Sequence, residues 1–354
     1  QISTYLCVSK DPERMIYRSK APLRIGLAGG GTDVSPYCDL YGGAILNTTV
    51  SLYANANIEP LQQDVIVLEA ADRGEMAEYA VGNQLPLDGK LDLLKGVYNR
   101  IKKEYDLPLK GLRLQTYVDA PAGSGLGTSS TLVVAIIGAF AEMLKLPLGE
   151  YDIAHYAYRI ERQDLNLAGG RQDQYAATFG GVNYMEFYEN DKVIVNPLRI
   201  KSEYLSELEN NLVLFYTASS RESAAIIKEQ QKNVHEKRED SIEAMHQLKE
   251  QSRMMKEALL KGRLDEIGEI LDFGFEQKRK MAANISNAFI EEIYEAAKNA
   301  GASGGKISGA GGGGFMMFYC PGNTRFKVIK ALEKFGGEVK QYIFTKNGLI
   351  TWAV

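Results

Sequence analysis

The sequence predicts a two-domain α+β fold. Its 354 residues exceed the length at which a single hydrophobic core usually suffices, so two domains are expected. Helical and strand-like segments are mixed without the regular strand–helix–strand alternation of a doubly wound parallel sheet. Near residue 208 this mixed pattern gives way to a long helical region. We therefore expect an N-terminal domain at residues 1–208 and a C-terminal domain at residues 209–354.

In the first half, the elements are predicted from the spacing of apolar residues. Between residues 22 and 60 short apolar runs alternate with polar residues and are interrupted by glycines, which is typical of strands joined by loops. The same criteria predict further strands at Val65–Leu68, Leu112–Val118 and Gly180–Glu186, and helices at Leu91–Tyr105, Ser129–Leu144 and Leu148–Asn166.

The second half begins with a predicted strand at Leu212–Tyr216, followed by about eighty residues in which apolar side chains recur at helical spacing. Because this spacing is not a sustained heptad, it favours packed helices over a coiled-coil interaction module. Towards the end we expect a helix, a glycine-rich turn, a strand at Phe315–Tyr319, a helix at Asn323–Phe335 and a strand at Val339–Phe344.

Composition excludes several classes of protein. Lys and Arg total 41 against 45 Asp and Glu, a net charge of −4, whereas a nucleic-acid-binding protein needs a strongly basic face. The longest apolar run, Leu132–Ala141, is too short to cross a bilayer, and the first residues do not have the pattern of a secretory signal. Cys7, Cys38 and Cys320 suit neither a metal site nor a disulfide framework. A cytoplasmic protein without nucleic-acid or membrane partners is expected; the oligomeric state, including a homodimer, stays open.

The segment Pro121–Ser130 has the pattern of a phosphate-binding loop. Its glycines allow the backbone to approach an anion closely, and the apolar stretch from Leu132 to Phe140 predicts a buried helix directly after it. The first N–H groups of a helix have no partners within the helix and lie at the positive end of its dipole. The segment therefore predicts nucleotide binding.

Other phosphate-binding signatures do not fit. No glycine-rich segment ends in the Gly-Lys-Ser/Thr of a Walker A loop. Gly309–Gly314 matches Gly-x-Gly-x-x-Gly, but the strand-like Phe315–Tyr319 follows it where a dinucleotide-binding turn opens a helix. Asp272–Gly274 spells a protein-kinase signature in a helical stretch and is attributed to chance.

Four segments in this order, residues 22–33, 121–130, 161–174 and 306–314, resemble the motifs of the GHMP kinase superfamily of small-molecule kinases. Within that superfamily the chain resembles the heptose 7-phosphate kinases, because Gly29–Asp33 reads Gly-Gly-Gly-Thr-Asp where galactokinases carry Gly-Glu-His-Thr-Asp. The resemblance implies an N-terminal half like domain 2 of ribosomal protein S5, a ferredoxin-like C-terminal half and ATP between them.

The resemblance also implies the parts of a phosphoryl-transfer site. Asp173 would deprotonate or orient the attacking hydroxyl, and Arg24 would stabilise the transferring charge or keep Asp173 ionised. Ser129 and Glu161 would hold Mg²⁺. The residues that would bind ATP are Pro121, Ala122, Gly123, Ser124, Gly125, Leu126, Gly127, Thr128 and Ser129.

The acceptor would be a sugar phosphate phosphorylated at its anomeric hydroxyl. The residues expected near the sugar are Gly30, Gly31, Thr32, Asp33 and Gly311, and the cations proposed for its phosphate are Arg171 and Arg221. Two other functions stay open: another anomeric sugar kinase, of the fucokinase or galactokinase type, and a non-catalytic sugar sensor.

Each of these residues also has an ordinary structural explanation. Glu161 fits a solvent-exposed ion pair on a helix, Asp173 a loop cap and Ser129 a helix N-cap. Gly309–Gly314 fits a tight packing turn, and Arg171 and Arg221 fit surface arginines.

Overall fold

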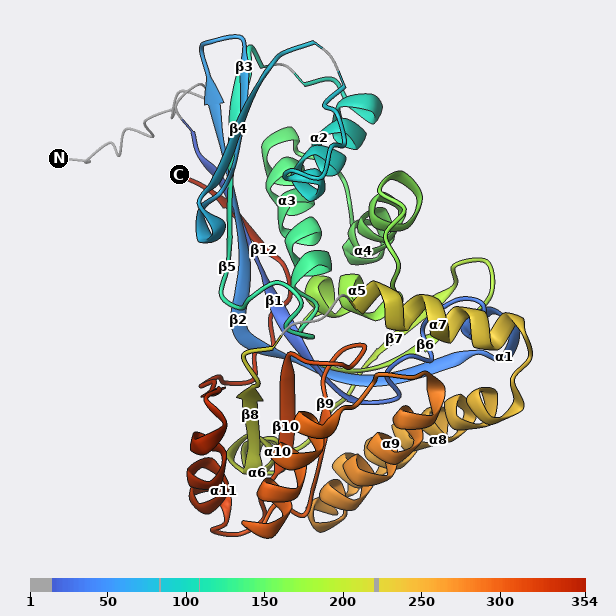
Figure 1. Ribbon diagram of the computed structural model, residues 1–354. Helices are drawn as coiled ribbons and strands as arrows, with labels where there is room; N and C mark the ends of the chain where they lie inside the picture. The colour runs from blue at the N-terminus through green and yellow to red at the C-terminus, as the bar shows by residue number, and fades with distance from the viewer. Residues whose placement is uncertain (1–14, 83, 108, 220–222) are drawn as a thin grey trace, which may run out of the picture.

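The computed structural model describes residues 15–82, 84–107, 109–219 and 223–354, and it contains two β-sheets (Figure 1). The larger sheet has the strand order β12-β1-β2-β5-β3-β4, with β6 paired to β2 and β7 to β6. All of its described pairs are antiparallel except β3 with β5. Its strands are β1 (Tyr17–Ala28), β2 (Gly43–Leu61), β3 (Val65–Ala70), β4 (Glu75–Ala80), β5 (Gly111–Val118), β6 (Val182–Phe187), β7 (Val193–Pro197) and β12 (Ile350–Ala353).

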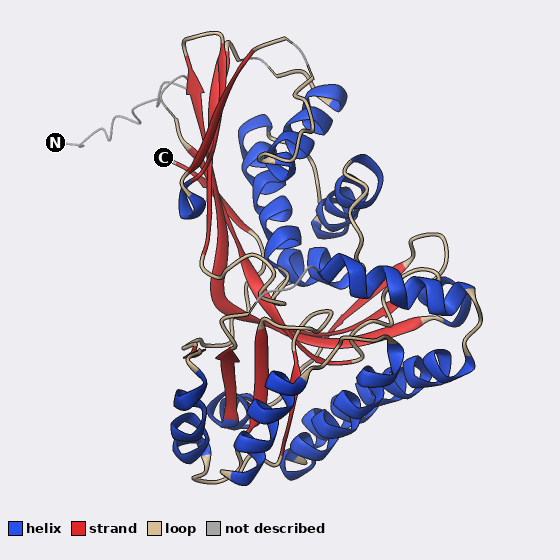
Figure 2. Cartoon of the chain, in the orientation of Figure 1, coloured by secondary structure: helices blue, strands red, loops and turns tan. Residues whose placement is uncertain are grey.

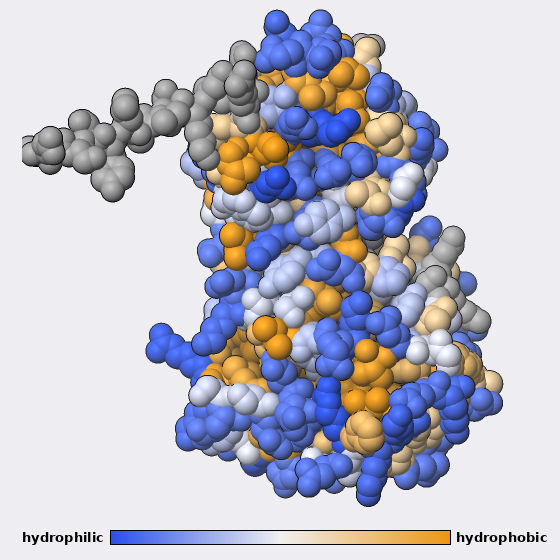
Figure 3. Space-filling view, turned by 90° about the vertical axis from the view of Figure 1, so that its left-hand side faces the viewer, coloured by the Kyte–Doolittle hydropathy of each residue, from blue (hydrophilic) through white to orange (hydrophobic). Residues whose placement is uncertain are grey.

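Strand β2 connects two regions of this sheet because it is 19 residues long. Its second half, from Ala54, pairs with β5, whereas its first half, from Gly43 to Thr48, pairs with β6. The region in which β2 pairs with β5 lies at the top of Figure 1. Helices α2 (Asp92–Glu104), α3 (Thr128–Leu144) and α4 (Glu150–Arg159) cover one face of it (Figures 1 and 2). On the opposite side of the molecule, hydrophilic and hydrophobic side chains are interspersed (Figure 3).

Helix α3 is the centre of the first core. Twelve of its 17 residues are buried, and apolar residues occur on all sides of it, which is typical of a helix enclosed by other elements. It packs on β1 and β2 and also contacts the shorter helix α5 (Gln172–Phe179). The predicted helix at Ser129–Leu144 is thus confirmed to within one residue. Its N-terminus points toward the junction with the second sheet (Figure 1).

The smaller sheet has the order β11-β8-β10-β9 and forms the second core with its helices. Its strands are β8 (Leu212–Tyr216), β9 (Gly304–Ile307), β10 (Phe315–Tyr319) and β11 (Glu338–Val339), and the helices of this part are α6 (Ser202–Asn211), α7 (Ser223–His235), α8 (Glu239–Lys261), α9 (Ile267–Met281), α10 (Ala288–Asn299) and α11 (Arg325–Leu332). The strands predicted at Leu212–Tyr216 and Phe315–Tyr319 are confirmed at both ends. In Figure 1, α7 lies above the β6–β7 region and α8 and α9 lie below it.

Two predicted elements differ from the structure. The helix predicted at Leu148–Asn166 ends at Arg159 and continues as a π-helical turn at Ile160–Asp164. The strand predicted at Val339–Phe344 is wrong beyond Val339, because the chain leaves the small sheet there and returns to the large one, where Phe344 bridges Val50. The sequence pattern also did not identify α1 (Tyr37–Tyr41), β4, β7, β9, β12, α5 or α6.

The end of the chain returns to the first sheet. Strand β12 pairs with β1, with Ala353 opposite Tyr17 and Ile350 opposite Lys20. A boundary near residue 208 stays a prediction, but residues 350–353 add a strand to the sheet of the first half. No helix in the described part of the chain has the length and hydrophobicity needed to cross a membrane.

Candidate active site

A cleft of about 280 Å³ lies where the two halves of the chain meet. Its walls come from the loop before α3, the loop before α5, the start of the β1–α1 connection, helices α7 and α9, and the turn after β9. The predicted residues that line it are Arg24, Gly31, Asp33, Gly123, Gly125, Gly127, Thr128, Ser129, Glu161 and Asp173. With Gly309 and Ala310 of the fourth segment, all four sequence motifs contribute to one cleft.

The loop before α3 needs its glycines. Gly123, Gly125 and Gly127 have φ values of +73°, +83° and +77°, a backbone conformation that other residues rarely adopt. A Cβ atom on Gly125 would lie 2.7 Å from the backbone oxygen of Ser308, and one on Gly309 would lie 2.7 Å from the Cα of Gly125. The loop and the turn after β9 are thus in contact through their backbones.

Not every residue of the predicted nucleotide loop reaches the cleft. Gly123, Gly125, Gly127, Thr128 and Ser129 line it. Ser124 and Leu126 are buried outside the lining, and Pro121 and Ala122 are exposed at the start of the loop. Residues that line the cleft therefore alternate with buried residues between positions 123 and 127, because the chain turns at each of the three glycines.

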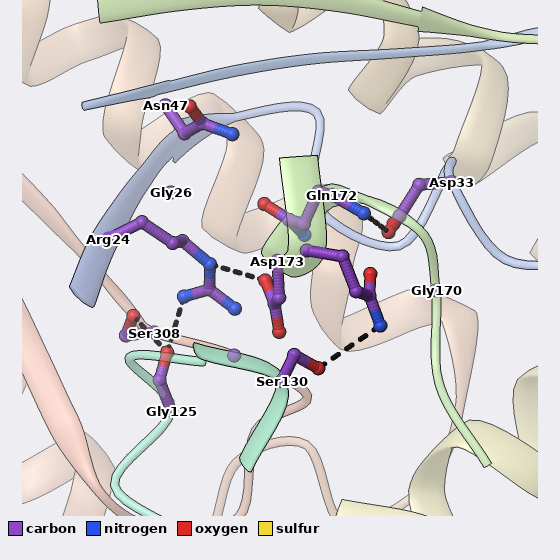
Figure 4. A network of polar contacts seen from close by, with 12 residues as sticks. Arg24, Gly26, Asp33, Asn47, Gly125, Ser130, Gly170, Gln172, Asp173 and Ser308 are labelled. Atoms are coloured by element: carbon purple, nitrogen blue, oxygen red, sulfur yellow. Dashed lines mark hydrogen bonds and ion pairs between the residues drawn. The ribbon is translucent and has the colours of Figure 1, made fainter. Parts of the chain in front are cut away.

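Arg24 connects three segments at the floor of the cleft (Figure 4). Its Nε donates to Oδ1 of Asp173 at 2.6 Å, and its Nη1 donates to the backbone oxygen of Gly125 at 2.6 Å. Arg24 is 4% exposed. A Cβ atom on Gly127 would lie 3.0 Å from the Asp173 carboxyl carbon, so this carboxylate lies directly against the glycine loop. The predicted proximity of Arg24 and Asp173 is present in the structure.

Asp33 fixes the start of α5. Its carboxylate accepts hydrogen bonds from the backbone N–H groups of Arg171, at 2.8 Å, and Gln172, at 3.0 Å (Figure 4). Burial raises the pKa of Asp33. A Cβ atom on Gly170 would lie 1.9 Å from Oδ2 of Asp33, so this approach requires glycine. Asp33 thus holds the helix that carries Asp173.

The other residues predicted for the acceptor have different positions. Gly31 lines the cleft. Thr32 is buried, and its hydroxyl accepts from the backbone N–H of Ala44, which is a structural contact. Gly30 lies beside Lys278, and Gly311 packs against Ile285 outside the lining of the cleft.

Glu161 is a buried carboxylate held by two neutral side chains. Ser130 Oγ donates to its Oε1 at 2.9 Å, and Gln174 Nε2 donates to its Oε2. No cation of the described residues lies within ion-pair distance of Glu161, and burial raises its pKa. Glu161 is therefore not part of a solvent-exposed ion pair, which was the ordinary structural explanation for it. The hydroxyl in contact with Glu161 belongs to Ser130, whereas the predicted Ser129 lines the cleft one residue earlier.

Arg171 is not placed to bind a ligand in the cleft. It is 4% exposed, and its guanidinium contacts Asp39 at 2.9 Å and Asp191 at 3.0 Å. It also donates to the Tyr188 backbone oxygen at 2.7 Å and to Ser35. These contacts join α1 to the β6–β7 region, so both phosphate binding and a surface position are wrong for Arg171. The other predicted cation, Arg221, lies outside the described residues.

Substitution of Arg171 by Ala is expected to lower the free energy of unfolding by roughly 3 kcal/mol, since it breaks a buried charge network whose carboxylates are about one-third exposed. The KM for the acceptor should not change in the fraction that folds. Urea denaturation and steady-state kinetics measure the two quantities, with the exposed Arg199→Ala as the matched control. A stable variant with a greatly raised acceptor KM would contradict this assignment.

Sequence reasoning missed several polar residues of the site. Gln174 and Ser130 hold Glu161, and Ser308 donates to the Gly125 backbone oxygen at 2.9 Å (Figure 4). Lys306 donates to the backbone oxygen of Gly26 at 2.8 Å. Lys278, on α9, also lines the cleft. Ser130, Gln174 and Ser308 lie within the identified motifs, whereas Lys278 lies in a helix that had no predicted function.

Comparisons with known proteins agree with this arrangement. Residues 92–181 match the N-terminal domain of the GHMP kinases, and residues 255–338 match their C-terminal domain. The chain is 48% identical to D-glycero-alpha-D-manno-heptose 7-phosphate kinase of Campylobacter jejuni, over 95% of this chain and 99% of that protein.

Two solved structures are also similar. One is the crystal structure of a D-glycero-D-manno-heptose 1-phosphate kinase from Bacteroides thetaiotaomicron, with a TM-score of 0.81 and 46% identity over 95% of this chain and 98% of that one. The other is a putative sugar kinase from Campylobacter jejuni, with a TM-score of 0.80 and 46% identity over 98% of this chain and 100% of that one.

Proposed function

Because the chain belongs to the GHMP kinase family, as its motifs predicted, we propose that it transfers the γ-phosphoryl group of ATP to the anomeric hydroxyl of D-glycero-α-D-manno-heptose 7-phosphate. The product would be the 1,7-bisphosphate, a precursor of nucleotide-activated heptose. The relative at 48% identity, which bears the name of this activity, supports the choice of acceptor. ATP and the sugar phosphate would be the ligands, in the cytoplasm.

The contact between Arg24, Asp173 and the glycine loop carries the proposal. Phosphoryl transfer depends mainly on positioning and on stabilisation of charge. The backbone N–H groups at the start of α3 would hold the phosphates of ATP. Asp173 would accept the proton of the sugar hydroxyl or align it, and Arg24 would hold the Asp173 carboxylate in place and face the transferring group.

We further propose that Glu161 and the hydroxyl of Ser129 or Ser130 hold Mg²⁺. A buried carboxylate with no paired cation among the described residues suits a divalent ion, and Mg²⁺ prefers few protein oxygen ligands. The described residues contain no group of three or more acidic, His or Cys side chains arranged to hold a metal ion, so phosphate oxygens and water would supply the remaining ligands. When bound, the ion would neutralise charge on the phosphates.

A second acceptor, a heptose 1-phosphate, is favoured by one observation: a similar solved structure is named a heptose 1-phosphate kinase. In that case the new phosphate would go to another hydroxyl. The two candidate reactions therefore differ in their acceptor and in their product.

The decisive measurement is ADP release with ATP and Mg²⁺ on a panel of acceptors, with the product position read by phosphorus NMR. We expect kcat/KM for heptose 7-phosphate to exceed that for unphosphorylated heptose, fucose and galactose by roughly 10³-fold or more, because a site built for a charged group rejects analogues that lack it.

Higher activity on an unphosphorylated hexose would replace this acceptor and leave the reaction class intact. Turnover with the 1-phosphate alone would favour the second acceptor. Sugar binding without turnover on any member of the panel would indicate a sugar sensor.

A further inference from the structure

Lys278 is a buried cation that forms no ion pair with a carboxylate of the described residues. It is 3% exposed, and its Nζ donates to the backbone oxygen of Gly309 at 2.5 Å. No carboxylate of the described residues lies within ion-pair distance of Nζ. An ammonium group has three N–H donors, so two stay available toward the cleft that Lys278 lines. Because an unpaired buried charge is costly, this arrangement indicates an anionic ligand.

The other cations that line the cleft are held by protein groups. Arg24 is paired with Asp173 and also contacts the Gly125 backbone. Arg162 is only partly buried, and its two terminal nitrogens donate to the backbone oxygens of Leu167 and Gly170. Among the described cations of the cleft, Lys278 is therefore the buried one that lacks a carboxylate.

Lys278 borders the side of the cleft predicted for the acceptor. A Cβ atom on Gly30 would lie 3.8 Å from its Nζ, and its partner Gly309 belongs to the turn that packs on Gly125 of the cradle predicted for ATP, so Lys278 lies where the predicted acceptor segment meets that cradle. Gly30 carries no side chain, so it places nothing but backbone next to the ammonium group. Gln230 of α7 lies on the same side, near Gly31.

Electrostatic effects at this position are consistent with a ligand-binding lysine. Burial is the largest cause that lowers the pKa of Lys278 to about 8, and the charge of Arg24 lowers it further. The carboxylate of Asp33 opposes both effects. Lys306 of β9 is also buried, and the charge of Lys278 contributes to lowering its pKa.

We propose that Lys278 binds the phosphate group that the acceptor already carries, and that it thereby selects a phosphorylated sugar over an unphosphorylated one. This inference rests on the proposed function, since it names the residue that recognises that substrate. It assigns to Lys278 the role that the sequence had suggested for Arg171. Lys278 makes no contact with Asp173, so loss of its charge should weaken acceptor binding more than the transfer step.

The test compares Lys278→Met and Lys278→Arg with the wild-type enzyme. Methionine preserves much of the aliphatic stem of lysine and removes the charge. The KM for heptose 7-phosphate should therefore rise roughly 10- to 150-fold, which is the loss of affinity expected when a hydrogen bond to a charged group is removed. The KM for ATP and kcat/KM for unphosphorylated heptose should stay unchanged. Arginine should restore part of the loss. Lys280→Met, at an exposed position of the same helix, is the matched control.

The pH dependence gives a second readout. Lys278 is charged below its pKa, so acceptor binding should weaken as the pH rises through about 8. The other charged groups facing this space are Arg24, Asp33, whose pKa burial raises, and Lys306, whose pKa burial lowers. The Lys278→Arg variant should show a flatter profile, because an arginine does not lose its proton in this range.

An equal fall in kcat for heptose 7-phosphate and for unphosphorylated heptose would overturn the proposal, since it would place Lys278 on the transferring phosphoryl group. An unchanged acceptor KM in Lys278→Met would overturn it as well. Thermal unfolding checks the fold: removal of an unpaired buried charge should leave the melting temperature unchanged or higher.

An error in the proposed function can be distinguished from an error in the role of Lys278. If the proposed function is wrong, the wild-type enzyme will show no turnover on heptose 7-phosphate. In that case, calorimetric titration with heptose 7-phosphate and with inorganic phosphate still compares wild type with Lys278→Met. Equal affinities would reject the role of Lys278, and weaker phosphate binding by the variant would support it.

Discussion

Replacement of Asp173 by asparagine is expected to lower kcat by roughly 10²- to 10⁴-fold, the usual contribution of a positioned acid or base. Asparagine has nearly the same shape, and its Oδ1 can still accept the hydrogen bond that Arg24 donates in the wild-type protein. It cannot accept the proton of the sugar hydroxyl, and it leaves the positive charge of Arg24 uncompensated. Steady-state ADP release measures kcat.

Binding of ATP separates this effect from loss of the fold. The carboxylate of Asp173 lies against the glycine loop, but it is not one of the backbone N–H groups proposed to bind the phosphates of ATP. The Kd for ATP, measured by calorimetry, should therefore change little. Asp72→Asn, at an exposed position far along the chain from the motifs, is the matched control and should retain full activity. A loss smaller than tenfold in kcat would mean that alignment by Arg24 and the glycine loop accounts for most of the catalysis.

The predictable parts of the fold are those with a strong local pattern. Helix α3 was predicted because its residues are apolar over nearly its whole length and follow three glycines. Strands β8 and β10 were predicted because both are continuous apolar runs. Strand β12 was not predicted, because pairing with β1, more than 300 residues earlier in the chain, leaves no local signal.

The site was predictable where motifs carried it and less so elsewhere. The contact of Arg24 with Asp173 joins residues 149 positions apart and was anticipated only through the family resemblance. Arg171 was assigned wrongly because sequence alone does not reveal that Asp39 and Asp191 surround its guanidinium. Lys278 was missed because a lysine on an amphipathic helix is usually exposed, and only tertiary packing buries it in the cleft.

Replacement of Glu161 by glutamine is expected to change activity and stability in opposite directions. We expect a fall in kcat/KM of roughly 100-fold or more, because loss of a ligand to a catalytic cation removes several kcal/mol of charge stabilisation. The Mg²⁺ concentration that gives half-maximal activity should rise. The melting temperature without ligands should rise as well, because glutamine removes a buried charge and can still accept from Gln174 and donate to Ser130.

The pH dependence of this stability gain follows from the raised pKa of Glu161. The folded protein holds the proton of Glu161 more tightly than the unfolded chain, so ionisation of this group lowers stability as the pH rises through the range between the two pKa values. Above the folded-state pKa the full cost is present, and in acid below the pKa of an unfolded glutamate it is absent. The difference in melting temperature between Glu161→Gln and wild type should therefore grow as the pH rises and should disappear in acid.

A matched variant distinguishes a cation ligand from an ordinary buried carboxylate. Ser130→Ala removes one hydrogen bond to Glu161 but keeps its charge, so it should lower the stability of the ligand-free protein, opposite to the effect of Glu161→Gln. If Glu161 holds the cation, Mg²⁺ together with ATP should raise the melting temperature of Ser130→Ala more than that of Glu161→Gln. Shifts in both variants that equal the wild-type shift would mean that the negative charge of Glu161 does not contact the ion, whatever its effect on kcat.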